Sequence, residues 1–144
     1  MDFSYAVAIS ASGMDVERTR LDVSALNLAN VHTSRTAEGG VFKPMRVVAG
    51  AGPVAPFSNA VASIGEVPGA RVVDIHRIDV PPRMAFEPGH PDADAQGFVA
   101  YPGVDTTVEM VNLMTAVRSY EANVIAMNAA KAMATKALEI GGGQ

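Results

Sequence analysis

The chain has 144 residues, the size of one domain, and carries 15 acidic against 11 basic side chains for a net charge of −4 at pH 7. This balance leaves no basic stripe to meet phosphates and argues against a nucleic-acid binder. With no cysteine, disulfides and thiolate metal sites are excluded. Apolar residues make up 49% of the chain but aromatics only 6%, which suits close helix packing better than a bulky globular core.

The amino-terminal stretch from Tyr5 to Met14 is small and apolar, as in a secretion signal. Asp2 precedes it and no basic residue occurs before Arg18, so the positively charged region of an ordinary signal is missing. The best window for a membrane helix, Ala122 to Leu138, contains both asparagines and lysines. We therefore expect neither an ordinary cleaved signal peptide nor a direct membrane span.

A first helix is predicted from Phe3 to about Asn30, because apolar side chains recur there at helical spacing. The small residues around Gly13 would let another backbone approach closely, although a glycine inside a helix costs about 1 kcal/mol relative to alanine. The alternative is a frayed, weakly helical terminus in the isolated chain. The stripe consists of Val7, Ala11, Met14, Leu21, Ala25 and Leu28, with Arg18 as its break.

The middle of the chain contains all nine prolines and predicts loops and short strands. Val41–Val48 is expected to be a strand that lies at a sheet edge or contains a bulge, because Pro44 cannot donate to a sheet ladder. Arg71–Val80 is the best strand, and its apolar residues change face, which predicts a bulge near His76–Arg77. The other expected segments are a loop over His32–Gly40, a loop over Ala49–Gly69, and short strands over Met84–Phe86 and Gly97–Tyr101.

The segment GHPDAD contains three side chains that are possible metal ligands, namely His90, Asp92 and Asp94. One interpretation is a small metal-dependent hydrolase. The other, which we favour, is a surface turn whose path is set mainly by the backbone preferences of Pro88, Gly89 and Pro91. No nucleophile elbow and no phosphate-binding loop occurs elsewhere, so no catalytic, metal or cofactor site is expected.

A second and longer helix is predicted from Thr106 to Ile140, a stretch without glycine or proline. Thr106 and Glu109 have the spacing of a capping box, and three glycines from Gly141 end the helix. Its length would be about 50 Å. The heptad stripe consists of Met110, Leu113, Val117, Tyr120, Val124, Met127, Lys131, Ala134 and Leu138, with Lys131 as its break.

The other faces of this second helix are also apolar. A helix that is apolar most of the way round must be surrounded, either by its own chain or by other chains. The pattern therefore indicates either a central helix of a small bundle or a helix whose burial is completed in an assembly. These additional residues are Val111, Met114, Ala122, Ile125, Ala129, Ala132 and Met133.

Two terminal motifs resemble those of the bacterial flagellar basal-body rod protein family. Ser12–Thr36 reads SGMDVERTRLDVSALNLANVHTSRT, similar to the family's pattern ASGM…R…LD…A.NLAN..T. Val108–Ile140 includes EMVNLMTAVRSYEAN, similar to its carboxy-terminal pattern EMV.L…R.YEAN. The segment Pro81–Val111 and the glycines Gly39–Gly40 resemble those of proximal-rod members. The least similar stretch is Ala49–Gly69.

The resemblance implies a mainly α fold with a small β part, in which the terminal helices pair as a coiled coil and a Pro/Gly-rich β-hairpin and loop segment joins them. It implies that residues 1–35 and 104–141 form a helical coiled-coil domain in the inner tube of the rod, and that residues 36–103 form a small β and loop segment outside it. The function implied is that of a structural subunit, not an enzyme, that assembles helically into the drive shaft and its export channel in the periplasm.

The partners implied are copies of the chain itself, proximal and distal rod subunits, the rod-base adapter and the flagellar type III export apparatus. Export would occur without a cleaved signal peptide. Besides the hydrolase, a membrane-active amphipathic helix pair remains as an alternative function. The polar residues Asn27, Asn30, Arg118, Glu121 and Asn123 lie inside the two motifs; Arg118 and Glu121 would either fix register or form a surface pair. The expected assembly interface consists of Val7, Met14, Leu21, Leu28, Asn30, Leu113, Val117, Tyr120, Val124, Met127 and Leu138.

Overall fold

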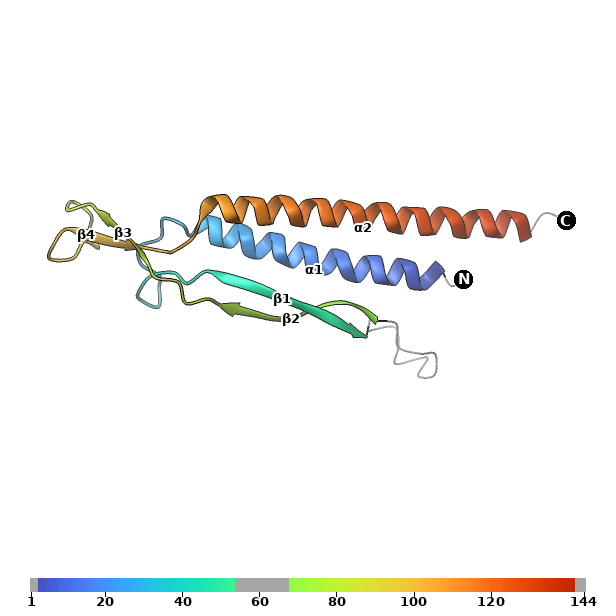
Figure 1. The fold of residues 1–144 in the computed structure, drawn as a ribbon, viewed down its shortest axis with the longest axis horizontal. Coiled ribbons are helices and arrows are strands. Elements are labelled where there is room, and N and C mark those ends of the chain that lie inside the picture. The colour runs from blue at the N-terminus through green and yellow to red at the C-terminus, as the bar shows by residue number, and fades with distance from the viewer. Residues whose placement is uncertain (1–2, 54–67, 142–144) are drawn as a thin grey trace.

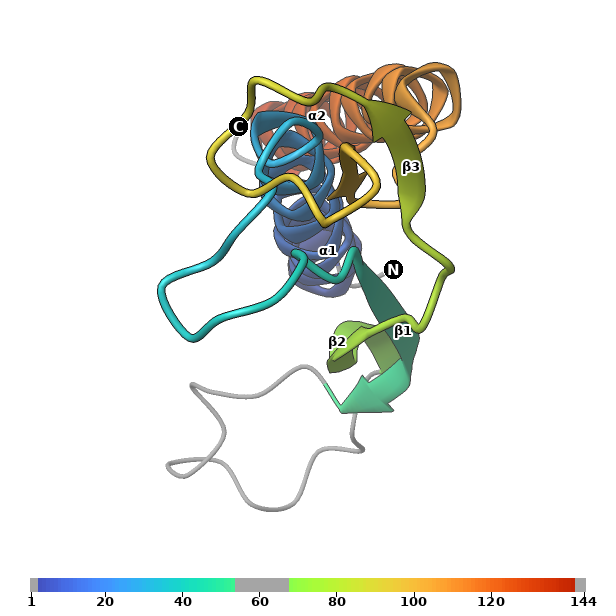
Figure 2. The same cartoon turned by 90° about the vertical axis from the view of Figure 1, so that its left-hand side faces the viewer.

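Two long antiparallel helices lie side by side along the long axis of the molecule (Figure 1). The computed structural model describes residues 3–53 and 68–141, and α1 spans Phe3–Ala29 and α2 spans Thr106–Gly141. A β-hairpin lies along the other side of α1, so that α1 is the middle of three layers (Figures 1 and 2). Both predicted helices are confirmed, as is the mainly α fold with a small β part. Their pairing as a coiled coil stays a prediction.

Small and polar residues fill the contact between the two helices. The buried residues of α2 are Glu109, Ala116 and Ala130. A Cβ atom on Gly13 would lie 2.8 Å from Nδ2 of Asn123, whose amide donates to the Ser119 carbonyl at 3.0 Å. A side chain at position 13 would have to displace the Asn123 amide, so the helices approach closely here, as the small residues around Gly13 predicted.

The first hairpin consists of β1 (Met45–Pro53) and β2 (Pro68–Arg77), paired antiparallel. Val48 pairs with Asp74 and Ala49 pairs with Val72, so Val73 is the extra residue of a bulge. The bulge predicted near His76–Arg77 was therefore misplaced.

The strands of this hairpin also differ from their predicted bounds. β1 begins after Pro44 and continues into the stretch predicted as a loop, because its small residues pair with β2 through the backbone alone. Of the loop predicted over Ala49–Gly69, residues 54–67 lie outside the described residues.

A second, shorter hairpin lies beyond the end of α1, at the end of the molecule away from both termini (Figure 1). It pairs β3 (Arg83–Phe86) with β4 (Phe98–Tyr101), which confirms both predicted short strands. The glycine with positive φ in its connection is Gly97, at 86°, where a side chain would also meet Phe86 and Pro88. Gly89, expected to matter for the turn, has no positive φ and open space around it.

The start of α2 is capped by Asp105 and not by Thr106. The Asp105 carboxylate accepts hydrogen bonds from the backbone amides of Thr107 at 2.9 Å and Val108 at 3.2 Å. This satisfies two of the free donors at the helix start. The predicted capping box is therefore wrong, and Glu109 is free for another role.

The core of the molecule is small. Among the described residues, the buried apolar side chains are Val16, Val23, Val99, Tyr101, Ala116 and Ala130. The accessible surface is 9778 Å², whereas a folded monomer of this mass exposes about 7,000 Å². The shape therefore leaves apolar surface exposed that one chain cannot cover.

Candidate assembly surface

The face of α2 that points away from α1 carries a stripe of large apolar side chains. Asn123 marks the side that contacts α1, at Gly13. At about 100° per residue, Met114, Arg118, Glu121 and Ile125 lie on the opposite side. Met114 is 59% exposed and Ile125 is 69% exposed. This outer face of α2 carries exposed apolar side chains that are uncovered in the single chain.

A second exposed apolar surface lies at the carboxy-terminal end of α2. Leu138 is 76% exposed and Ile140 is 84% exposed. Figure 1 shows α2 extending past the amino-terminal end of α1, so α1 does not cover these last turns. Both surfaces are therefore exposed apolar patches of the kind found at protein–protein interaction sites.

The hairpin β1–β2 is fixed to α1 through Asn27, which is fully buried. Its amide donates to the Met45 carbonyl at 2.9 Å, and the Met45 amide donates back to its carbonyl oxygen at 2.9 Å. Farther along, the Ala70 amide donates to the Ser12 hydroxyl at 3.1 Å. Side chains of α1 thus supply the hydrogen bonds that another strand would supply.

An ion pair joins the hairpin to α2 across α1. Arg46 of β1 donates through Nη1 to Oε1 of Glu109, whose side chain is 3% exposed. A buried carboxylate left without its cation is strongly destabilising, so this pair holds the two outer layers in one position.

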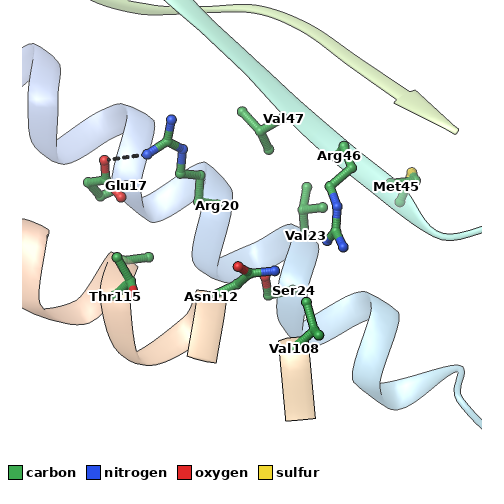
Figure 3. Close-up of a pocket in the computed structure, with 11 residues that line it drawn as sticks. Glu17, Arg20, Val23, Ser24, Met45, Arg46, Val47, Val108, Asn112 and Thr115 are labelled. Atoms are coloured by element: carbon green, nitrogen blue, oxygen red, sulfur yellow. Dashed lines mark hydrogen bonds and ion pairs between the residues drawn. The ribbon is translucent and has the colours of Figure 1, made fainter. Parts of the chain in front are cut away.

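A groove of about 310 Å³ lies where α1, β1 and the first turns of α2 meet (Figure 3). Inside it Arg20 donates to Glu17 at 3.0 Å. Oε2 of Glu17, like Oε2 of Glu109, is buried and has no hydrogen-bond partner among the described residues. The groove is lined by Glu17, Arg20, Val23, Ser24, Met45, Arg46, Val47, Val108, Asn112, Thr115 and Ala116. The side chains that line this groove offer packing and ionic contacts to a neighbouring surface.

The three candidate metal ligands do not converge. His90 accepts the Asp92 amide at its Nδ1, while the Asp92 carboxylate accepts Ser34 and Arg35 at 2.8 Å each. The Asp94 carboxylate caps the turn and accepts the amide of Phe98 at 2.8 Å. Across residues 3–53 and 68–141, no cluster of three such side chains is placed to hold a metal ion. Asp92 thus anchors the turn to the loop after α1, so the turn depends on its side chains as well as its prolines.

The short hairpin is anchored by Tyr101. Its hydroxyl donates to Glu87 at 2.9 Å, and this bond, followed by burial, raises the pKa of Tyr101 above its ordinary value. His32 and His90 each contact the ring edge-on, and the Arg83 guanidinium lies 5.4 Å from its centre. The loop after α1 and both strands thus meet at one side chain.

The structure divides the expected interface residues between half-buried and exposed positions. Asn30 donates to the Leu26 carbonyl at 2.9 Å and so acts within its own helix end. The half-buried group is Val7, Met14, Leu21, Leu28, Asn30, Leu113, Val124 and Met127. The exposed group is Val117, Tyr120 and Leu138.

Sequence reasoning missed the pairing of Asn27 with Met45 and of Arg46 with Glu109, because each joins segments far apart in the chain. Arg118 and Glu121, considered as a surface pair, form no ion pair with each other in the described structure. Neither α1 nor α2, as described, has a window apolar enough to cross a membrane.

Comparisons with known proteins agree on one family. The family model "Flagellar basal body rod FlgEFG protein C-terminal" matches residues 95–140. The flagellar basal-body rod protein FlgC of Yersinia enterocolitica is 38% identical over 133 residues, which cover 92% of this chain and 93% of that protein. FlgC of Bacillus subtilis is 39% identical over 145 residues, covering 95% and 97%. FlgC of Aquifex aeolicus is 36% identical over 141 residues, covering 96% and 97%.

Proposed function

The chain belongs to the family of flagellar basal-body rod proteins FlgC, and we propose that it assembles helically into the proximal rod through the exposed faces of its two helices. It is a structural subunit of the flagellar basal body and not an enzyme. Like other members of the family it assembles with rod components. We propose which surfaces of the chain form these contacts.

The main support for this assembly is the exposed outer face of α2. A contact between this face and a different surface of the next copy does not close, and repeating it produces a helical tube and not a ring. Such a tube transmits torque through packed helices, and its centre leaves a channel. No covalent bond is made or broken in this function.

The helical and the β parts of the chain have different places in the proposed assembly. We assign residues 1–35 and 104–141 to the inner tube as a coiled coil and residues 36–103 to its outside. Support comes from the arrangement of α1 between α2 and the hairpin, which leaves one side of each helix free (Figure 2). The exposed Val117, Tyr120 and Leu138 are available to neighbouring chains at once, and the half-buried members of the expected interface complete the contact from its edges.

Neighbours in the rod would be copies of the chain, other proximal and distal rod subunits and the rod-base adapter. The proposed route is export through the flagellar type III apparatus without a cleaved signal, followed by assembly in the periplasm. An elongated chain with a small core suits such a route, because little packed structure must be opened for export.

Ile125→Asp tests the assembly role. Ile125 is exposed, so an aspartate there leaves the single chain folded, whereas in a dry contact it costs several kcal/mol. Cells whose only copy carries this change should export the chain and lack a complete rod, and Ile125→Leu should assemble normally. Val124→Asp is a less clean variant because Val124 is half-buried in its own chain. Normal motility with Ile125→Asp would remove the outer face of α2 from the interface.

A further inference from the structure

The outer face of α2 carries two charges without partners in the middle of its apolar stripe. The side chains of Arg118 and Glu121 are exposed and form no hydrogen bond or ion pair in the described structure. They lie between Met114 and Ile125, which are also exposed. A charge pair flanked by apolar residues is the pattern of an interface whose centre fixes the register.

The outer face of α1 carries a matching set. Asp15, Arg18 and Asp22 are exposed, and their side chains likewise have no partner among the described residues. At about 100° per residue, the three fall within one narrow sector of α1. Gly13, which contacts α2, and Asn27, which contacts the hairpin, lie in other sectors.

The two outer faces point away from each other within one chain, so they cannot meet inside it. They do meet when copies stack side by side in the same orientation. Since α1 and α2 run in opposite directions, α2 of one copy then lies antiparallel to α1 of the next (Figure 1).

Building on the proposed function, we propose that Arg118 faces Asp22 and Glu121 faces Arg18 of a neighbouring copy of this chain, and that these two ion pairs set the stagger between copies. In the antiparallel arrangement both pairs form together, because Arg118 and Glu121 are about 4.5 Å apart along the axis and Arg18 and Asp22 about 6 Å. Met114 then meets the exposed Leu26.

The register implies an axial offset between copies. Within one chain Asn123 lies beside Gly13, which places Arg118 level with Arg18. Pairing Arg118 with Asp22 instead shifts the neighbour by four residues, or about 6 Å. A shift repeated at every contact produces a helical assembly and not a flat ring.

Two other arrangements of neighbouring helices would use the same charges, and each would be detected by a different second-site variant. If α2 lay parallel to the neighbour's α1, Arg118 would face Asp15. If α2 paired with α2 of a second copy, Arg118 would face Glu121, and the contact would close as a two-fold dimer.

Charge reversal distinguishes the three pairings. Each variant is the only copy in a strain that lacks the wild-type gene, and the amount of the chain in isolated basal bodies is measured relative to the amount exported. Arg118→Glu should lower incorporation by about tenfold or more, because like charges then face each other. Adding Asp22→Arg should restore it to within about threefold. Arg71→Glu, which reverses an exposed cation on β2 that forms no hydrogen bond or ion pair in the described structure, is the matched control and should have no effect.

Adding Asp15→Arg or Glu121→Arg to Arg118→Glu should not restore incorporation. Rescue by either of these, failure of Asp22→Arg to rescue, or wild-type incorporation of Arg118→Glu would each overturn the pairing. The proposed function has its own readout: the wild-type chain should be found in basal bodies and Ile125→Asp should not, whichever charges face each other. Because all these charges are exposed and unpaired in the single chain, urea unfolding of the purified variants should match the wild type.

Discussion

Asn27 shows how one side chain replaces a strand. It is fully buried, and its amide group forms two hydrogen bonds with the backbone of Met45, the first residue of β1. A buried amide group that lost these bonds would leave the donor and the acceptor of Met45 unsatisfied. The asparagine therefore fixes both the position and the register of the hairpin on α1.

Asn27→Ala should lower the free energy of unfolding by about 2–4 kcal/mol, because two buried backbone groups lose their partners. Urea unfolding followed by circular dichroism measures this directly. Asn30→Ala is the matched control and should cost less than about 1 kcal/mol, because Asn30 bonds only to residues at its own helix end. An equal decrease in the free energy of unfolding for the two variants would show that the hydrogen bonds to Met45 do not stabilise the fold more than those of Asn30 do.

Glu109 illustrates why the partners of some side chains could not be predicted from the sequence. Its spacing from Thr106 matched a capping box, yet Asp105 caps the helix and Glu109 pairs with Arg46, 63 residues away in sequence. Local patterns carry no information about such a distant partner. The same holds for Asp92, whose partners Ser34 and Arg35 lie in the loop after α1.

At the scale of elements, the helices were predictable and the strand register was not. Helix propensity and apolar spacing are local, and they placed both helices to within one residue at most ends. The bulge at Val73 depends on which residues of β1 and β2 face each other, and Gly50 and Gly52 in β1 carry no side-chain signal.

The sequence indicated that α2 has an assembly surface, but it did not indicate which residues contact α1. The apolar excess of α2 indicated that other chains complete its burial. The heptad stripe chosen from the sequence lies at the edge of the contact with α1, and Ala116 and Ala130 lie at its centre. Small residues give a weak hydrophobic signal but allow the closest approach, so the stripe of larger residues did not identify the centre of the contact with α1.

The carboxy-terminal turns of α2 should be the least protected part of the helix in the single chain. α1 does not reach them, and Leu138 and Ile140 are almost fully exposed (Figure 1). Hydrogen exchange of the purified monomer should be at least about tenfold faster over residues 133–141 than over residues 108–130. Uniform protection along α2 would mean that the overhanging turns are stabilised by something other than α1.

The whole molecule is a three-layer rod with an accessible surface well above that of a globular chain of its mass. Large apolar side chains are exposed on the side of α2 opposite α1, and the unpaired charges of α1 lie on the side of α1 opposite α2. Two unlike faces on opposite sides are what a non-closing assembly requires. The central claim is therefore that the outer face of α2 becomes buried when the chain joins the basal body.

Cysteine labelling at Met114 tests this claim most directly, because the chain has no cysteine of its own. Met114→Cys is exposed to a maleimide in the purified chain, and denaturation before labelling gives the complete signal for each sample. We predict that labelling in isolated basal bodies is at least about tenfold slower than in the purified chain, because neighbouring chains exclude water from the interface. Equal labelling rates in the two samples would contradict it.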